Sequence, residues 1–156
     1  MKINQSSVAS EAGLVVEALT NEQIGPTFAI LRLTQRHADQ RRWEEYCRRS
    51  LAAKPERRGI ITVRRKTATF PSGLACYHCG PDFEAKRLLT AHPFTAVDIL
   101  DPGPFLASLA AGLVCIARVA ACQAVRLVVP EGVVADRTLL GLPNASEIKT
   151  EYTFTL

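Results

Sequence analysis

Two cysteines and two histidines are the residues whose types and spacing first suggest chemistry, at a metal ion. Cys76 and Cys79 form a C-x-x-C pair around His78, and His92 follows thirteen residues after Cys79. These side chains would supply three or four zinc ligands, but a structural zinc site generally brings two ligand pairs. On an extended strand, Cys76 and Cys79 also point to opposite faces. The sequence therefore predicts no metal site, and the spacing identifies no partner for a nucleophilic cysteine.

Positive charge is concentrated in one part of the chain. The net charge is +4, whereas residues 32–66 hold twelve Lys and Arg against four Asp and Glu. Such a segment attracts nucleic acid, a phosphorylated cofactor or an acidic partner, or it is a solvated helix face. Glu44 and Glu45 precede Arg48 and Arg49 by four residues, which favours the helix face. The arginines form no compact recognition motif, so we expect no sequence-specific binding of nucleic acid.

Length and composition are those of an ordinary globular protein. The 156 residues fit one domain, and 47% of them are apolar. Residues 1–7 lack the apolar core of a secretion signal, and five cysteines are an odd number for a disulfide framework. We therefore expect one cytoplasmic domain over residues 1–156, with reduced thiols and a loosely ordered segment at residues 1–12. The apolar run from Pro102 to Ala117 is short for a membrane span and stops at Arg118, which predicts a buried helix and no membrane contact.

Hydrophobic periodicity predicts alternating strands and helices. Thr20 to Gln23 have the pattern of a capping box that starts the first helix, and Asp39 stands where the second begins. The predicted order is a strand at 14–19, helices at 24–37 and 39–51, an antiparallel hairpin of strands at 60–63 and 74–77, a strand at 94–100, a helix ending near 122, a strand at 124–129, a short helix at 134–140 and a strand at 151–156. An apolar helix between two apolar strands predicts a βαβ unit with parallel strands. The fold class is therefore α/β (α+β).

The order of these elements resembles the GNAT superfamily of acyl-CoA-dependent N-acyltransferases. The resemblance runs from about Val15 to Leu156 and rests on the order and spacing of elements more than on signature residues. Residues 15–31 are similar to the family's opening strand and helix, and residues 96–129 are similar to its central βαβ unit. The resemblance implies a mixed central sheet in which an antiparallel hairpin is followed by the βαβ unit, with helices on both faces.

In that family the cofactor lies between the two splayed strands of the βαβ unit. The resemblance implies that the main chain of Ile99 and Leu100 holds the pantetheine. It also implies that Gly103 and Phe105 supply amides to the pyrophosphate at the N-terminus of the helix, where free N–H groups and the helix dipole favour an anion.

The loop before this helix departs from the family's glycine-rich pattern. Pro102 and Pro104 offer no N–H. Asp101 can accept one of the remaining amides, and it places a negative charge where phosphate would lie. We therefore expect acetyl-CoA to bind weakly.

Two catalytic roles follow from the resemblance. Asp98 matches the base for the acceptor amine, and its apolar neighbours predict a raised pKa. The alternative is that Asp98 faces solvent or pairs with an arginine such as Arg126. The family's acid is a tyrosine whose place falls near Arg137, so Tyr152 is the candidate that the sequence leaves.

Trp43 and Tyr46 lie one helical turn apart. In the resembled family this region borders the acceptor groove, so the pair would be substrate-binding residues that stack on the acceptor. A helical aromatic pair beside Leu51 is also typical of a core.

The resemblance implies an N-acyltransferase that moves the acyl group of acetyl-CoA, or of another acyl-CoA, to an amine. The acceptor, a small molecule or a protein, is unknown. The alternative is a catalytically weakened or inactive GNAT-like binding module that acts through its basic helix, with a homodimer as one form.

Overall fold

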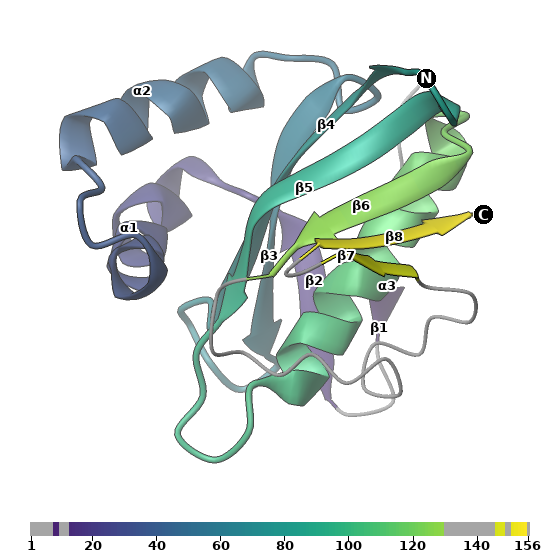
Figure 1. The fold of residues 1–156 in the computed structure, drawn as a ribbon. Coiled ribbons are helices and arrows are strands. Elements are labelled where there is room, and N and C mark those ends of the chain that lie inside the picture. Colours follow the sequence, from purple (N-terminus) through teal and green to yellow (C-terminus); the bar gives the residue numbers. More distant parts are fainter. Residues whose placement is uncertain (1–7, 10–12, 130–145, 149–150, 156) are drawn as a thin grey trace.

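Eight strands form one sheet in this computed structural model, which describes residues 8–9, 13–129, 146–148 and 151–155. The strands are β1 (Val8–Ala9), β2 (Leu14–Ala18), β3 (Arg58–Arg65), β4 (Gly73–Asp82), β5 (Lys86–Ala96), β6 (Ala124–Val128), β7 (Ser146–Ile148) and β8 (Glu151–Thr155). Their order across the sheet is β1-β2-β3-β4-β5-β6-β8-β7 (Figure 1). In the described part of the chain β5 and β6 are parallel, and the other neighbouring strands are antiparallel.

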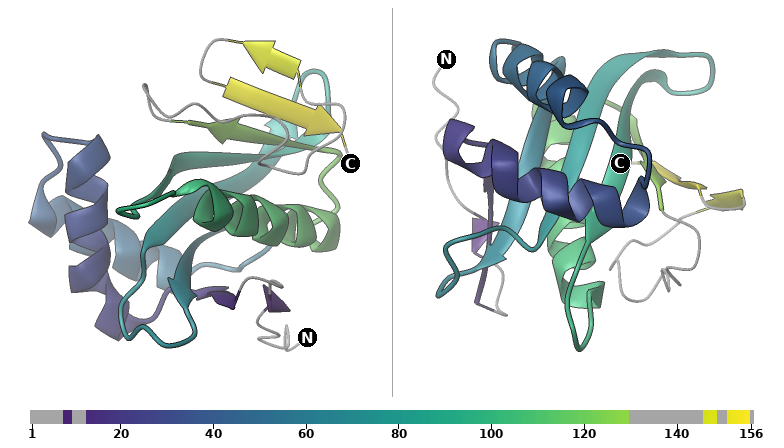
Figure 2. Two further views of the ribbon diagram at one scale, coloured as in Figure 1. Left: turned by 90° about the horizontal axis from the view of Figure 1, so that it is seen from below. Right: turned by 90° about the vertical axis from the view of Figure 1, so that its left-hand side faces the viewer.

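Helices cover both faces of the sheet, as predicted (Figure 2). One face carries α1 (Ile24–Thr34), which follows a short 3-10 turn at Asn21–Gln23, and α2 (Gln40–Leu51). The other face carries α3 (Gly103–Val119). Each face has its own apolar cluster, one around α3 and one between α1, α2 and the sheet. The predicted α/β class and the mixed sheet are therefore confirmed.

The predicted helix starts are present in the contacts of the chain. The Thr20 amide donates to Gln23 Oε1 at 3.1 Å, which is the reach-back of a capping box. Asp39 caps α2 by accepting the Arg42 amide at 2.9 Å. On the exposed side of α2, Arg48 pairs with Glu44 at 3.2 Å as predicted, but the Glu45 carboxylate pairs with Arg41.

Apolar side chains explain why α3 lies against the sheet. Leu106, Leu109, Leu113 and Ala117 recur every three or four residues and are all buried. Arg118 is exposed, as predicted for the first charged residue of the helix. The strand, helix and strand β5-α3-β6 form the predicted parallel βαβ unit. Among the described residues, no helix is both long and apolar enough to cross a membrane.

The strand before α3 begins and ends earlier than predicted. We expected it at residues 94–100, whereas β5 runs from Lys86 to Ala96. The residues between the strands predicted at 74–77 and 94–100 contain the tight turn of a second hairpin. In this turn Asp82 Oδ2 accepts the amides of Glu84 and Ala85 at 3.1 and 3.3 Å. Leu88 and Leu89 face opposite sides and are both buried, so β5 lacks the alternation that marks a half-exposed strand.

Two further predictions concern segments that the structure describes only in part or not at all. Val8–Ala9, within the segment expected to be loosely ordered, pairs with β2 as a short strand. The short helix predicted at 134–140 lies outside the described residues. The five cysteines are free thiols, as predicted.

Gly73 lies where β3, β4 and β5 approach one another closely. A Cβ at this position would lie 2.9 Å from Val63 Cγ1, 2.9 Å from Ala96 Cβ and 3.0 Å from the Thr95 carbonyl oxygen. The last of these is backbone within the sheet, so it cannot rotate away. Only glycine lets the three strands approach here.

We therefore predict that Gly73→Ala destabilises the protein by about 2 kcal/mol, the usual effect of overpacking a core. Gly25→Ala is the matched control, because a Cβ at Gly25 in α1 meets nothing within 4 Å. Gly25→Ala should leave the stability unchanged or raise it by up to about 1 kcal/mol. Urea unfolding measures both. Equal effects of the two substitutions would contradict the close approach.

Candidate functional site

β5 and β6 separate part-way along the sheet. Their pairing runs from Leu88 with Ala124 to Ala91 with Leu127 and ends there, although β5 continues to Ala96. The ladder between β4 and β5 is irregular at the same level, because His92 and Pro93 together face the single residue Cys76. Such a bulge bends a strand and re-aims its side chains. The edge of β5 beyond Ala91 is thus turned away from β6, as the ribbon shows (Figure 1).

His92 lies where the two strands part. Ala91 is buried in the cluster beneath α3, so the alternation of the strand puts His92 on the opposite face, where its side chain is exposed. The His92–Pro93 peptide bond is cis. The sequence suggested His92 only as a zinc ligand, since nothing in it indicated a bulge at this residue.

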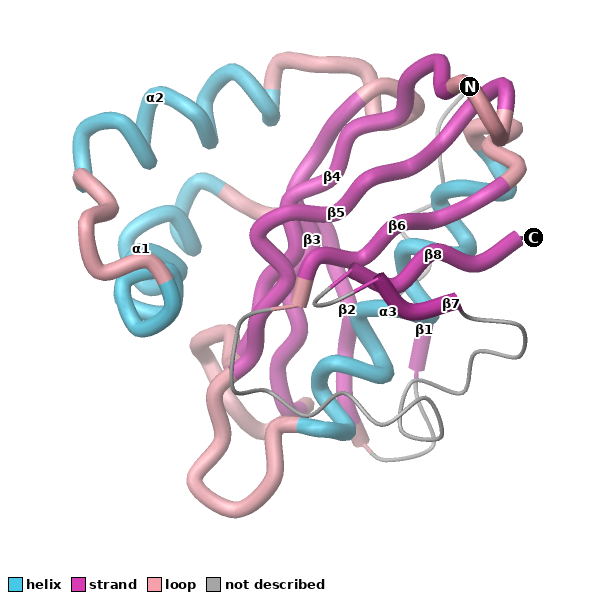
Figure 3. The backbone as a smooth tube through the Cα atoms, viewed as in Figure 1, coloured by secondary structure: helices cyan, strands magenta, loops and turns pink. Residues whose placement is uncertain are grey.

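The chain then runs through a long loop from Ala96 into α3 (Figure 3). Asp98 organises its first half. Asp98 Oδ1 accepts the amides of Leu100 and Asp101 at 2.9 and 3.1 Å, and Asp98 Oδ2 pairs with Arg65 of β3 at 2.8 Å. The hydrogen bond from Arg65, helped by the two amides, holds the pKa of Asp98 below its ordinary value. The expected raised pKa was wrong, because the sequence could not reveal Arg65 beside this carboxylate. The pairing with an arginine, which was the alternative, is present with Arg65.

Asp101 fills the N-terminus of α3. Asp101 Oδ1 accepts the Gly103 amide at 2.8 Å, and the flanking Pro102 and Pro104 have no amide to offer. The Leu106 amide bonds to the Pro102 carbonyl oxygen at 3.1 Å, as in a regular helix. The Phe105 amide is therefore the one N–H in this described turn that remains for another acceptor. The Phe105 ring is buried, and the Arg65 guanidinium carbon lies 5.1 Å from its centroid.

Ile99 and Leu100 lie in the loop and not on a strand. Both side chains are almost fully exposed, at 101% and 91%. The Leu100 amide already donates to Asp98. The expected strand position of these two residues was therefore wrong, because β5 ends at Ala96.

Trp43 belongs to the core between α2 and α1. Its side chain is 5% exposed, and its indole N–H donates to the Ile24 carbonyl oxygen at 3.1 Å. Tyr46 stacks against it, with ring centroids 6.0 Å apart, and is only partly buried. Burial raises the pKa of Tyr46. Of the two aromatic residues, Tyr46 is therefore the one that reaches the surface, where Arg58 lies over its ring at 5.1 Å.

Tyr152, the candidate acid, and Arg137, which stands at the place of the family's tyrosine, lie near or beyond the limits of the described chain. Tyr152 of β8 pairs through its backbone with Leu127, the last residue of β6 that pairs with β5. Its backbone is therefore level with the point where the strands part. Arg137 lies outside the described residues.

The cysteines are not arranged for metal binding. Cys76 lies in the cluster between the sheet and α1 and α2, whereas Cys79 packs against the cluster beneath α3. The two thiols thus point to opposite faces, as the strand pattern predicted. Burial raises the pKa of Cys76, and it raises the pKa of Cys79 to about 12, so both remain protonated thiols at neutral pH. In the described ranges, no three His, Cys, Asp or Glu side chains gather as a metal site.

The hollows in the described surface include two of several hundred Å³. The larger, about 610 Å³, lies at the opposite end of α3 from the loop, between Leu19, Ile60 and Ile116. The other, about 500 Å³, is an open apolar depression lined by Ile30 and Leu33 of α1, by Phe70 and Pro71 and by Val97. The second is the one beside the end of β5.

The overall arrangement agrees with that of solved acetyltransferases. The structure matches a chain of the NatC complex bound to Gag peptide and CoA, with a TM-score of 0.67 at 8% identity over 92% of this chain and 98% of that chain. It matches glucosamine-6-phosphate N-acetyltransferase from Arabidopsis thaliana with a TM-score of 0.63 at 10% identity, over 86% of this chain and 95% of that chain. It matches a GNAT-family acetyltransferase from Streptococcus pneumoniae with a TM-score of 0.63 at 8% identity, over 92% and 99% of the two chains. The chain has the GNAT fold.

No family model matches the sequence, and no curated protein matches it at the sequence level. The GNAT fold is therefore shown by geometry alone, at identities of 8–10% for these three structures. In this GNAT fold, β5-α3-β6 is the βαβ unit that the sequence indicated at residues 96–129, and its first strand lies ten residues earlier than that range.

The contact between Arg65 and Asp98 gives a testable pH dependence. Because the pKa of Asp98 is lowered in the folded state, its contribution to stability is present above the unfolded pKa and is lost as the pH falls through the folded pKa. Arg65→Gln should move the Asp98 titration up toward its ordinary value, as measured by carbon NMR of the carboxyl group. Lys66→Gln removes the neighbouring exposed charge and is the control. An unchanged titration in Arg65→Gln would refute the pairing.

Proposed function

We propose that this protein transfers an acyl group from an acyl-CoA to a primary amine. The observation that carries the proposal is the separation of β5 and β6 beyond Ala91 and Leu127, with an exposed histidine at the point of separation. The edge of β5 from His92 to Ala96 has main-chain groups that β6 does not pair. Such groups need hydrogen-bond partners, and the amides of a pantetheine arm can provide them. The support from these main-chain groups does not depend on which side chains the strand carries.

We therefore assign the binding of pantetheine, which was expected for the main chain of Ile99 and Leu100, to the main chain of residues 92–96. A pantetheine arm along this edge would bring the thioester to the point where β5 and β6 separate, between Ala91 and Leu127. We call this point the vertex. The NatC structure among those with this fold is bound to CoA and a peptide, which supports an acyl-CoA and an amine as the two substrates here.

His92 is the candidate base. A neutral imidazole at the vertex accepts a proton from the acceptor ammonium, and the free amine then attacks the thioester carbonyl carbon. The bond from carbon to nitrogen forms, the bond from carbon to sulfur breaks, and the departing thiolate takes a proton. Tyr152 is the candidate donor, because its backbone is level with the vertex. Asp98 is a weaker candidate base, since its pKa is lowered and its oxygens are engaged by Arg65 and two amides.

The pyrophosphate is the part of the cofactor that the chain fits least well. The amides of Leu100, Asp101 and Gly103 are bonded to Asp98 and Asp101, which leaves the Phe105 amide. Arg65 is the nearby cation, and Asp98 neutralises it. We therefore propose that acyl-CoA binds chiefly through pantetheine and weakly through its phosphates.

Asp101→Asn tests this account of the loop. The substitution removes a negative charge but keeps an oxygen for the Gly103 amide. Two unit charges about 4 Å apart in water repel by roughly 1 kcal/mol, so the dissociation constant for acetyl-CoA should fall about fivefold to tenfold. Calorimetric titration measures it. Glu22→Gln, which removes an exposed charge from the 3-10 turn before α1, should have no effect. Unchanged affinity in Asp101→Asn would show that the phosphates do not approach this helix.

His92→Gln tests the base. Loss of a positioned general base should lower the rate of acyl transfer about 10²- to 10⁴-fold without changing the affinity for CoA. The assay follows thiol release from acetyl-CoA with a mixture of tetrapeptides that have free N-termini. His37→Gln, an exposed histidine between α1 and α2, is the control. Equal rates for His92→Gln and the wild type would exclude His92 as the base.

The internal hydrogen bonds of the loop before α3 favour one second candidate function. A chain whose phosphate-facing amides are satisfied internally can retain the fold as a binding module without transferase activity. A folded protein that binds neither acetyl-CoA nor CoA would favour this candidate over the enzyme.

A further inference from the structure

A row of polar side chains crosses the sheet at one level. Arg58 of β3 is directly opposite His78 of β4, His78 is opposite Thr90 of β5, and Thr90 is opposite Arg126 of β6. Residues that are directly opposite in a sheet share a face and lie about 5 Å apart from strand to strand. The row of Arg58, His78, Thr90 and Arg126 therefore spans roughly 15 Å of one face.

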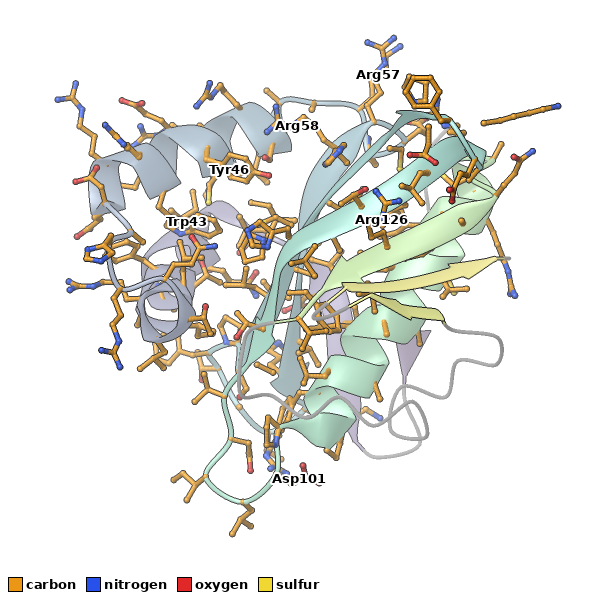
Figure 4. The ribbon with its side chains drawn as sticks, in the orientation of Figure 1. Trp43, Tyr46, Arg57, Arg58, Asp101 and Arg126 are labelled. Carbon is orange, nitrogen blue, oxygen red and sulfur yellow. The ribbon has the colours of Figure 1, made fainter. Side chains whose placement is uncertain are left out.

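This face is the one opposite α3. Tyr77, Leu89 and Val125, each next in sequence to a member of the row, lie in the cluster beneath α3. The members of the row accordingly point to the other side, where His78 is exposed and the rest are partly exposed. Figure 4 shows Arg58 next to Tyr46 under α2, and Arg126 across β5 from them.

The row presents hydrogen-bond donors along with charge. Both arginines are cations at any physiological pH, and His78 donates at least one N–H in either protonation state. Arg58 lies over the Tyr46 ring, and its Nε is buried without a hydrogen-bond partner. A buried donor without a partner is unfavourable.

The row lies beside the proposed base. His92 is two residues beyond Thr90 on the same strand and the same face, a separation of about 7 Å. Arg126 is one strand away from Thr90. A molecule whose amine lies at His92 and whose body extends along this face would therefore pass over the arginines within roughly 7–12 Å of the amine.

We propose that the acceptor carries an oxyanion, a carboxylate or a phosphate, at that distance from its reactive amine. The inference rests on the proposed function for the position of the amine, but the row can be tested without any acyl transfer. Carboxylates at the third and fourth positions of an extended peptide lie within this range, because each residue adds about 3.3 Å. A phosphate at the end of a six-carbon amine presents the same chemistry from a small molecule.

The test measures binding of three probes to the full chain by calorimetry. The first is a hexapeptide with a free N-terminus and glutamates at positions two to four, the second has glutamines there, and the third is 6-aminohexyl phosphate. The wild type should bind the glutamate peptide at least tenfold more tightly than the glutamine peptide, and added salt should reduce the difference. A preference for the phosphate over the glutamate peptide would identify a small-molecule acceptor.

Arg58→Gln and Arg126→Gln should each weaken binding of the anionic probes threefold to thirtyfold and leave the glutamine peptide unchanged. Arg57→Gln is the matched control, since Arg57 is the next residue along and its side chain points away from the row (Figure 4). Thermal unfolding checks that Arg58→Gln still folds, and Arg126→Gln carries the test if it does not. Equal affinity for the glutamate and glutamine peptides together with no binding of 6-aminohexyl phosphate, or an equal loss in Arg57→Gln, would overturn the proposal. Anionic binding without thiol release from acetyl-CoA would refute the transferase and leave the anion site in place.

Discussion

The proposed site of this protein depends on where one pair of strands stops pairing. β5 and β6 are hydrogen-bonded over four residues each, and β5 then continues past a bulge to Ala96, paired with β4 but no longer with β6. A strand edge away from its neighbour must find other partners for its main-chain groups, and the separation therefore supports the proposed binding of pantetheine at this edge. It puts His92 at the vertex and leads the chain into the loop that precedes α3. The rest of the sheet keeps the two strands in place, with α3 buried beneath them and α1 and α2 on the opposite face.

In the loop before α3, backbone amides donate hydrogen bonds to carboxylates of the same loop. Asp98 and Asp101 accept three amides between them, and Arg65 balances the charge of Asp98. The N-terminus of a long helix favours negative charge, and here the chain supplies that charge. Any phosphate that binds at this end must compete with Asp101 for the Gly103 amide, or use the amide of Phe105. In the proposed function, the same contacts that stabilise the loop would lower the affinity for a phosphorylated ligand.

Much of the fold could be predicted from local patterns, whereas the site could not. The capping residues Thr20 and Asp39, the β-branched β3 and the apolar α3 each carry their structure in a few adjacent residues. β5 was misplaced because its buried leucines face both ways, so no alternation marks the strand. The interpretation of Trp43 as a core residue agrees with its burial. The pKa of Asp98 depends on Arg65, which is 33 residues away in the sequence. The row from Arg58 to Arg126 exists only through the registers of four strands, which the sequence does not encode locally.

The proposed function requires the free edge of β5 to bind the pantetheine arm. Amide hydrogen exchange with and without acetyl-CoA tests it most directly, because a ligand bonded to main-chain groups slows exchange at those groups. The amides of residues 92–96, apart from Pro93, and those of residues 127–129 should be protected when acetyl-CoA is added. Protection confined to the hollow between Leu19, Ile60 and Ile116, or no change anywhere in a folded sample, would contradict it.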